Sequence, residues 1–131
     1  MLDVSFTADM RLYNPSTMAF LGDGVYEMLV REHIVLKNGS LSSGKLHTLT
    51  VEWVRASAQA SAFLKLEPFL SEEELSIYRR GRNSHGVSVP KSASSADYRS
   101  ATGLEALFGW LYLLGRNERM KSLFAVIVDD N

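Results

Sequence analysis

Helical periodicity runs along most of this chain and restricts the folds that it can adopt. Between residues 14 and 37 the large apolar side chains recur at spacings of three and four, which places them on one face of a helix. They are Met18, Leu21, Val25, Met28 and Leu29. Asn14-Pro15 is a favourable helix start, and Asn38-Gly39 is a typical helix end. No Asn-Gly or Asp-Gly pair lies between alternating apolar segments, as a hairpin turn would require, so we expect an all-α fold.

Four further helices are expected, over residues 42–64, 67–83, 98–115 and 117–130. The apolar spacing in 42–64 is continuous and predicts one long helix. Ser71 and Glu74 match a capping box at the start of the next one. The stretch 84–97 is rich in small and polar residues and is predicted to be a loop. We expect a single domain that spans residues 1–131 and holds about six to seven helices, of which these patterns place five.

The composition fits an ordinary globular domain and excludes some classes of function. Of the 131 residues, 46% are hydrophobic and 22% are charged. The formal net charge of −1 argues against a strongly basic protein that coats nucleic acid non-specifically, although it allows a local basic patch. The chain has no cysteine, so disulfide bonds and thiolate metal sites are excluded.

The sequence carries no sign of export or membrane insertion. Residues 1–16 lack the basic segment followed by an apolar one that a secretory signal would have. The longest apolar run, residues 107–115, is too short to span a bilayer. We therefore expect a cytoplasmic protein without a membrane partner.

The first predicted helix contains an acid in an unusual setting. Asp23 lies opposite the apolar stripe, on a side that also carries Phe20 and Val30, so this helix is expected to be buried on two sides. Gly22 and Gly24 flank Asp23, and each costs about 1 kcal/mol relative to alanine in a helix. A close approach by another helix or by a ligand would offset that cost.

A second acid is placed still less favourably. In the predicted helix 98–115, Glu105 lies beside Ala101, Phe108 and Tyr112, and no clear polar face is left for it. An isolated buried carboxylate costs several kcal/mol or becomes protonated. Glu105 therefore needs a nearby cation, either a basic side chain or a metal ion.

The two acids have two explanations in sequence terms. If their helices cross, Asp23 and Glu105 can share a hard divalent cation through carboxylate oxygens, and Mg²⁺ is the usual choice. An ordinary ion pair with Arg79, Arg80 or Arg99 is the other explanation, and it is the commoner arrangement in proteins. The sequence leaves both open.

A basic segment lies between the two acids. Residues 78–86 place three arginines around Gly81 at a predicted helix end, and Lys91 and Arg99 follow. Arginine side chains bind phosphate oxygens well, and a glycine permits close approach of a backbone. Beside an acidic metal site such a segment suits phosphodiester hydrolysis. The alternative is that these arginines only complement the helix dipole.

Four stretches of the chain are similar to one family of ribonucleases. FLGDGVYE, residues 20–27, resembles the signature helix of ribonuclease III, and TGLEALFGWLYL, residues 102–113, resembles that family's second acidic motif. RRGRN, residues 79–83, and YRSATGLEAL, residues 98–107, look like Mini-ribonuclease III, the short branch of the family. The resemblance covers roughly residues 10 to 125.

The resemblance implies a homodimeric endonuclease that cleaves double-stranded RNA with Mg²⁺, for which Mn²⁺ can substitute. It implies 5′-phosphate and 3′-hydroxyl ends and, for the short branch, maturation of 23S ribosomal RNA from its precursor, with a ribosomal protein as a candidate helper. Asp23 and Glu105 match the family's acids and would be catalytic residues and metal ligands. The predicted RNA-binding residues are Arg80, Arg82, Asn83 and Lys91.

Three other acids of the family have no counterpart in this chain. Their positions fall on Ala19, Thr102 and Ser43, which weakens the expectation of a second metal ion. These losses support an alternative function, a non-catalytic RNA-binding or ribosome-assembly factor on the same fold. A helical protein-interaction domain without an RNA role is a third reading. The length leaves no room for the double-stranded-RNA-binding domain that usually follows, so RNA contacts would come from the catalytic domain.

Overall fold

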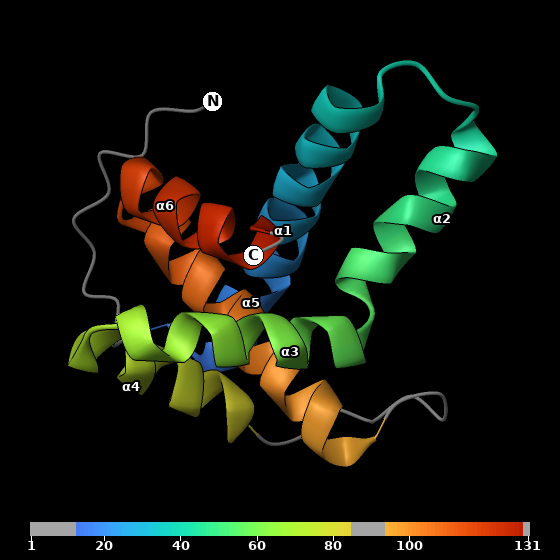
Figure 1. The fold of residues 1–131 in the computed structure, drawn as a ribbon. Helices are drawn as coiled ribbons and strands as arrows, with labels where there is room; N and C mark the ends of the chain where they lie inside the picture. Colours follow the sequence, from blue (N-terminus) through green and yellow to red (C-terminus); the bar gives the residue numbers. More distant parts are fainter. Residues whose placement is uncertain (1–12, 85–93, 130–131) are drawn as a thin grey trace.

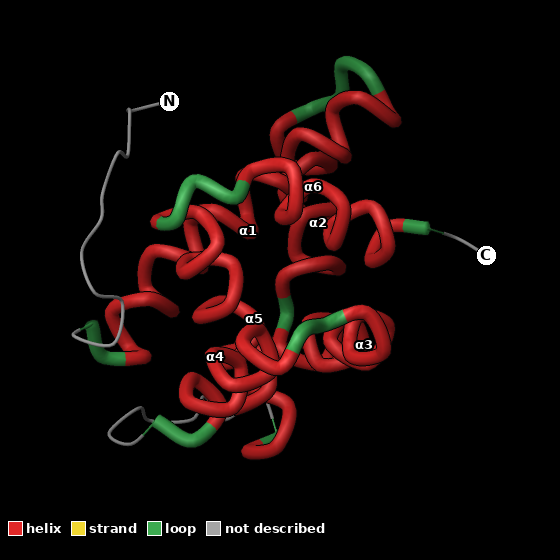
Figure 2. The backbone as a smooth tube through the Cα atoms, turned by 90° about the vertical axis from the view of Figure 1, so that its left-hand side faces the viewer, coloured by secondary structure: helices red, strands yellow, loops and turns green. Residues whose placement is uncertain are grey.

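The computed structural model describes residues 13–84 and 94–129, and in these ranges every regular element is a helix (Figures 1 and 2). The elements are α1 (Pro15–Asn38), α2 (Ser43–Val54), α3 (Ala56–Leu66), the short 3₁₀ helix η2 (Glu67–Phe69), α4 (Glu72–Arg82), α5 (Ser95–Leu113) and α6 (Asn117–Val128). The predicted all-α class and the predicted number of helices are confirmed. No helix within the described ranges has the length and apolar character needed to cross a membrane.

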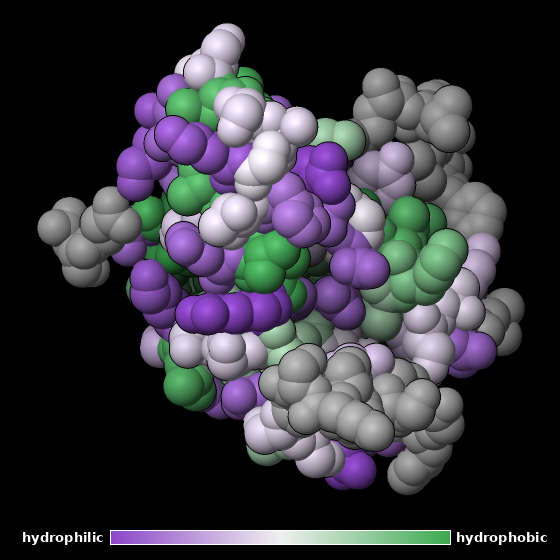
Figure 3. Space-filling view, turned by 90° about the vertical axis from the view of Figure 1, so that its right-hand side faces the viewer, coloured by the Kyte–Doolittle hydropathy of each residue, from purple (hydrophilic) through white to green (hydrophobic). Residues whose placement is uncertain are grey.

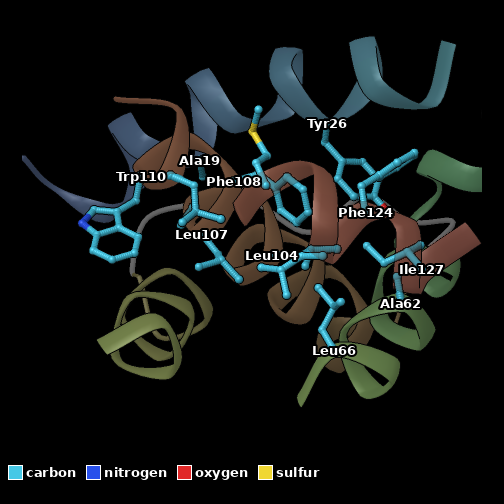
Figure 4. Close-up of a cluster of buried hydrophobic side chains, with 14 of the residues drawn as sticks. Ala19, Tyr26, Ala62, Leu66, Leu104, Leu107, Phe108, Trp110, Phe124 and Ile127 are labelled. Carbon is cyan, nitrogen blue, oxygen red and sulfur yellow. The ribbon is translucent and has the colours of Figure 1, made fainter. Parts of the chain in front are cut away.

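Helix α5 occupies the centre of the fold, in contact with α1, α3, α4 and α6 (Figure 1). From Ala101 to Leu111 every residue except Glu105 is buried. A helix that is apolar on nearly all sides is stable only when other helices surround it, and α5 has this position. Its side chains meet those of α1, α3 and α6 in one hydrophobic cluster, which includes Tyr26, Leu66 and Phe124 (Figure 4).

Glycines allow α1 and α5 to approach each other closely. A Cβ atom on Gly22 would collide with the backbone carbonyl of Glu105, and one on Gly109 would collide with the carbonyl of Met18. The predicted close approach therefore occurs at Gly22. It does not occur at Gly24, where an added Cβ would meet nothing within 4 Å.

A second glycine contact joins α4 to α5. A Cβ atom on Gly103 would lie 2.7 Å from the ring of Tyr78, and one on Gly81 would lie 2.7 Å from the Cβ of Ala106. Helix α5 thus contacts α4 at Gly103 and α1 at Gly109, which lie on either side of Glu105 in the sequence. Backbone contact of this kind fixes the position of Glu105 more tightly than contact through flexible side chains would.

The predicted buried face of α1 was wrong in its rotation about the helix axis. The buried residues are Met18, Ala19, Gly22, Tyr26, Val30 and Ile34. Met28, which was assigned to the stripe, is 66% exposed, and Phe20 is 84% exposed. The reason is that α5 packs against the glycine side of α1, where the backbones can touch. The spacing of large apolar side chains cannot identify this side of the helix, because the glycines there have no side chains.

The long helix predicted over 42–64 is also wrong. The chain bends at Arg55, whose ψ of 153° is extended, so that Arg55 ends α2 and precedes α3. No glycine or proline marks this bend in the sequence. A buried side chain compensates for it, because Gln59 donates a hydrogen bond from Nε2 to the backbone carbonyl of Val54 at 2.9 Å.

Two helix starts near the functional residues are set by serine caps. The predicted capping box is confirmed, because the backbone N–H of Glu74 donates to the hydroxyl of Ser71 and the N–H of Ser71 donates to the carboxylate of Glu74. Helix α5 begins at Ser95, earlier than the predicted residue 98, with Ser94 accepting a hydrogen bond from the N–H of Asp97.

Candidate metal centre

The structure brings Asp23 and Glu105 together. The carbonyl of Glu105 lies against Gly22, so the neighbouring Asp23 and the side chain of Glu105 lie at the same crossing of α1 and α5. Asp23 is exposed, whereas Glu105 is mostly buried. Burial, and after it the negative charge of Asp23, raise the pKa of Glu105 to about 8. The site thus holds two carboxyl groups that cannot both be charged without cost.

Neither acid is paired with a basic side chain among residues 13–84 and 94–129. Arg80 instead donates from Nη2 to the backbone carbonyl of Tyr13 at 3.4 Å. Glu27, one turn after Asp23, forms an ordinary surface pair with Arg31 at 2.8 Å. The ion-pair explanation of Asp23 and Glu105 that the sequence left open is therefore not what the described structure contains.

Gln59 is the one neutral side chain that is hydrogen-bonded to Glu105 in the described ranges. Its Nε2 donates to Glu105 Oε2 at 3.2 Å. This hydrogen bond lowers the pKa of Glu105 and so acts against burial and Asp23. Sequence reasoning missed Gln59. A signal existed, since its spacing places it on the same face of α3 as the apolar residues Ala62, Phe63 and Leu66.

Tyr26 is a second polar group close to Glu105. It is buried, and its ring packs edge-on against Phe108 at a centroid distance of 5.2 Å. Within the described part of the chain its hydroxyl has no hydrogen-bond partner. Burial, with the charge of Glu105 as the smaller cause, raises the pKa of Tyr26 above its usual value, so the hydroxyl is neutral at pH 7.

The residues at this crossing fit a divalent cation. A metal ion would relieve the repulsion between the two carboxylates and would favour the ionised form of Glu105. In the described part of the chain no group of three or more His, Cys, Asp or Glu side chains could hold a metal. Two carboxylates with the remaining positions filled by water is the arrangement that Mg²⁺ accepts most readily.

The positions of the three missing family acids do not add ligands. Ala19 is buried, and Thr102 is buried with its hydroxyl donating to the carbonyl of Tyr98 at 3.0 Å. Ser43 lies elsewhere, at the start of α2, where it lines a groove with Arg31 and His47. The described residues therefore supply two carboxylates at the crossing, those of Asp23 and Glu105.

A cleft of about 500 Å³ opens beside Glu105. The bend between α2 and α3 forms one wall with Arg55, Ser57 and Gln59. The first two turns of α5 form the other wall, and Asp97 and Tyr98 belong to it. The cleft gives a charged ligand access to Glu105 from the solvent.

The predicted basic residues lie at the end of α4, where α4 meets α5. Arg80 and Asn83 line a hollow of about 450 Å³ together with Asn14 and Ser84. Arg82 is exposed, donates from Nε to the side-chain oxygen of Asn83 at 3.2 Å, and lies 5.7 Å from the ring centroid of Tyr78. Lys91 lies outside the described residues.

Sequence comparisons with known proteins agree on one family. The ribonuclease III domain matches residues 16–116. A Mini-ribonuclease 3 of Brevibacillus brevis is 44% identical over 125 residues, which cover 92% of this chain and 92% of the relative. That of Clostridium tetani is 38% identical over 121 residues, covering 92% and 80%. A crystal structure of a Fusobacterium nucleatum protein has a TM-score of 0.84 at 30% identity and covers 93% of this chain and 98% of its own.

Proposed function

Because this chain belongs to the ribonuclease III family, in its Mini-ribonuclease 3 branch, and is an endoribonuclease of that type, we propose that it hydrolyses double-stranded RNA at a metal site made by Asp23 and Glu105. The products would carry 5′-phosphate and 3′-hydroxyl ends. The observation that supports the site most strongly is that two carboxylates meet at the α1–α5 crossing and that no basic side chain of the described residues is paired with either.

The proposed chemistry assigns each residue at the crossing a separate task. A bound Mg²⁺, or Mn²⁺ in its place, would polarise the phosphate and lower the pKa of a water molecule. Asp23, being exposed, lies where it can bind the cation from the solvent side, and Glu105 binds it from the protein side. The cleft beside Glu105 is open to an RNA backbone.

Binding of the RNA duplex is proposed to involve the C-terminal end of α4. Arg80 and Asn83 share one hollow, and Arg82 is exposed next to them, so all three present polar groups on the same part of the surface. Lys91 is proposed to extend this surface. Double-stranded RNA is recognised mainly through its shape, phosphates and 2′-hydroxyl groups, which suits a basic surface without base-reading elements.

A homodimer is proposed because α1 and α2 expose large apolar side chains. They are Phe20, Met28, Val35, Leu36 and Val51. Figure 3, which looks onto the α2 side of the molecule, shows apolar patches between hydrophilic side chains. A two-fold interface over these helices would cover them and supply one acidic site for each RNA strand. Sedimentation should give a dimer, and a monomer at micromolar concentration would contradict this part of the proposal.

Duplex cleavage is the test of the proposed chemistry. The protein should cut a long RNA duplex with Mg²⁺ and leave it intact with a chelator. Asp23→Asn and Glu105→Gln should each abolish cutting while the variants remain folded and bind the duplex. Full activity in either variant would refute the assignment. The family assignment favours an enzyme over the non-catalytic RNA-binding factor, which would bind in all these conditions without cutting.

The natural substrate is proposed to be precursor 23S ribosomal RNA. This rests on membership of the Mini-ribonuclease 3 branch. A transcript containing the paired ends of that precursor should be cut at discrete positions, and the 5′ ends of the products should be phosphorylated. Repeating the reaction with and without ribosomal proteins would identify a helper.

A further inference from the structure

Gln59 connects the bend between α2 and α3 to the candidate metal centre. Its side chain is 2% exposed. Its two amide hydrogens are both used, one by the carbonyl of Val54 at 2.9 Å and the other by Glu105 Oε2 at 3.2 Å. We propose that Gln59 is a positioning residue, which holds the carboxylate of Glu105 in the orientation that binds the divalent cation. This inference rests on the function proposed above.

The need for such a residue follows from the position of Glu105. A glutamate has three side-chain torsions, and the last one is broad, so a carboxylate without partners samples several orientations. No basic side chain among the described residues holds Glu105 in place. A single directed hydrogen bond to Oε2 limits the plane of the carboxylate without neutralising its charge. Partners that orient a metal ligand in this way commonly matter nearly as much as the ligand.

Gln59 is itself held in a fixed position. Val54 is the last residue of α2, and its carbonyl is one of those that the bend at Arg55 leaves without a helical partner. The hydrogen bond to this carbonyl fixes the amide plane, and therefore the direction in which the second hydrogen points. The bend of the backbone and the orientation of Glu105 are thus coupled through one side chain.

The unused oxygen of Gln59 argues that the residue does more than fill space. Its Oε1 is buried and has no hydrogen-bond partner among residues 13–84 and 94–129. A buried acceptor without a partner destabilises a fold, and a methionine of nearly the same shape would avoid this. A purely structural role therefore explains the Val54 bond but not the choice of an amide that leaves one oxygen unsatisfied beside Glu105.

The test compares Gln59→Met with Lys65→Met. The first variant keeps the length of the side chain and removes the amide. The second is the matched control, since Lys65 is also on α3 and donates to the carbonyl of Ile127 at 3.1 Å, away from Glu105. Mn²⁺ binding is measured by calorimetry without RNA, together with melting temperature, duplex affinity in chelator, and kcat and KM in Mg²⁺.

Gln59→Met should bind Mn²⁺ about tenfold or more weakly than the natural sequence, and kcat should fall while KM for the duplex is unchanged. Lys65→Met should lower the melting temperature and leave Mn²⁺ affinity unchanged. Gln59→Asn keeps the amide but shortens its reach, so its Mn²⁺ affinity should lie between those of Gln59→Met and the natural sequence. If Gln59→Met does not fold, Gln59→Asn is used in its place.

Two failures are distinguishable. If the natural sequence binds Mn²⁺, Glu105→Gln abolishes that binding, and Gln59→Met or Gln59→Asn binds Mn²⁺ like the natural sequence, then only the positioning role is refuted. If the natural sequence binds no Mn²⁺, or Glu105→Gln binds it normally, then the metal site itself is refuted, and the positioning role with it.

Discussion

Two glutamates lie within the helical core, and their surroundings are opposite. Glu74, at the start of α4, is 3% exposed and has a partner on each carboxylate oxygen. The N–H of Ser71 donates to Oε1 at 2.9 Å, and Arg119 donates to both oxygens, at 2.8 and 2.9 Å. The hydrogen bond from Arg119 is the largest cause that lowers the pKa of Glu74.

Glu105 receives one amide hydrogen bond and faces a second carboxylate. Burial and the charge of Asp23 raise the pKa of Glu105 to about 8, so its ionised form is disfavoured. The ionised form of Glu74 is instead favoured. Arg119 supplies a cation to Glu74, whereas no basic side chain in residues 13–84 and 94–129 is paired with Glu105. We interpret the first as a structural ion pair and the second as a site prepared for a metal ion.

Asp23→Lys should give Glu105 a basic partner, so that it forms a structural ion pair like that of Glu74. A lysine at this exposed position can reach Glu105 and act as Arg119 does for Glu74. We expect cleavage to fall by about 10³-fold or more, because the cation would no longer bind between two acids. The free energy of unfolding in chelator should rise relative to Asp23→Asn. Duplex cleavage and urea denaturation measure the two effects, and an active Asp23→Lys would break the comparison.

Gly22→Ala should separate the two acids by pushing α1 from α5. The added Cβ would collide with the carbonyl of Glu105, so we expect a loss of about 3 kcal/mol or more in the free energy of unfolding. Gly24→Ala is the matched control: its Cβ would meet nothing within 4 Å, and it should stabilise the helix by about 0.5–1 kcal/mol. Equal effects of the two changes would show that the close approach of α1 and α5 is not required.

Arg119→Met should remove the cation from Glu74 and leave a buried charge without a partner. We expect a loss of about 2–3 kcal/mol in the free energy of unfolding, reduced from the value for a fully buried pair because Arg119 is 37% exposed. Arg116→Met removes a surface pair with Glu73 at 3.2 Å and should cost less than about 1 kcal/mol. Denaturation curves compare them, and cleavage per folded molecule should not change in either.

The two glutamates should also respond to pH in opposite directions. The folded state holds a proton on Glu105 between its unfolded pKa of 4.5 and about 8, so in chelator this group lowers stability as pH rises across that range. Glu105→Gln should remove this decline. Glu74 has a lowered pKa, so its contribution is present above 4.5 and is lost as pH falls through the folded pKa. Unfolding curves measured from pH 4 to 8.5 distinguish these behaviours.

Much of the fold could be predicted from sequence because it depends on local signals. The helix start at Asn14 and the capping box at Ser71 and Glu74 are set by residues within a few positions. Glu105 could be singled out because the surrounding helix offered it no polar face. Its meeting with Asp23 was one of two explanations that the sequence left open.

The features that sequence missed depend on contacts between distant segments. The buried side of α1 is determined by Gly22, whose contribution is the absence of a side chain, and a count of large apolar residues cannot detect it. The bend at Arg55 has no local helix-breaking residue and is stabilised by Gln59. Arg119 lies 45 positions from Glu74, and only the fold brings the two together.

Crystals grown with Mn²⁺ provide the most direct measurement of whether Asp23 and Glu105 share a cation. Anomalous scattering should show a manganese peak at ligand distance from both carboxylates, with water in the remaining positions and the Gln59 amide still bonded to Glu105. Crystals of Arg119→Met should show the same peak, and no peak should appear at Glu74. Absence of manganese at the α1–α5 crossing, or Asp23 and Glu105 hydrogen-bonded to each other at saturating Mn²⁺, would contradict the proposed metal centre.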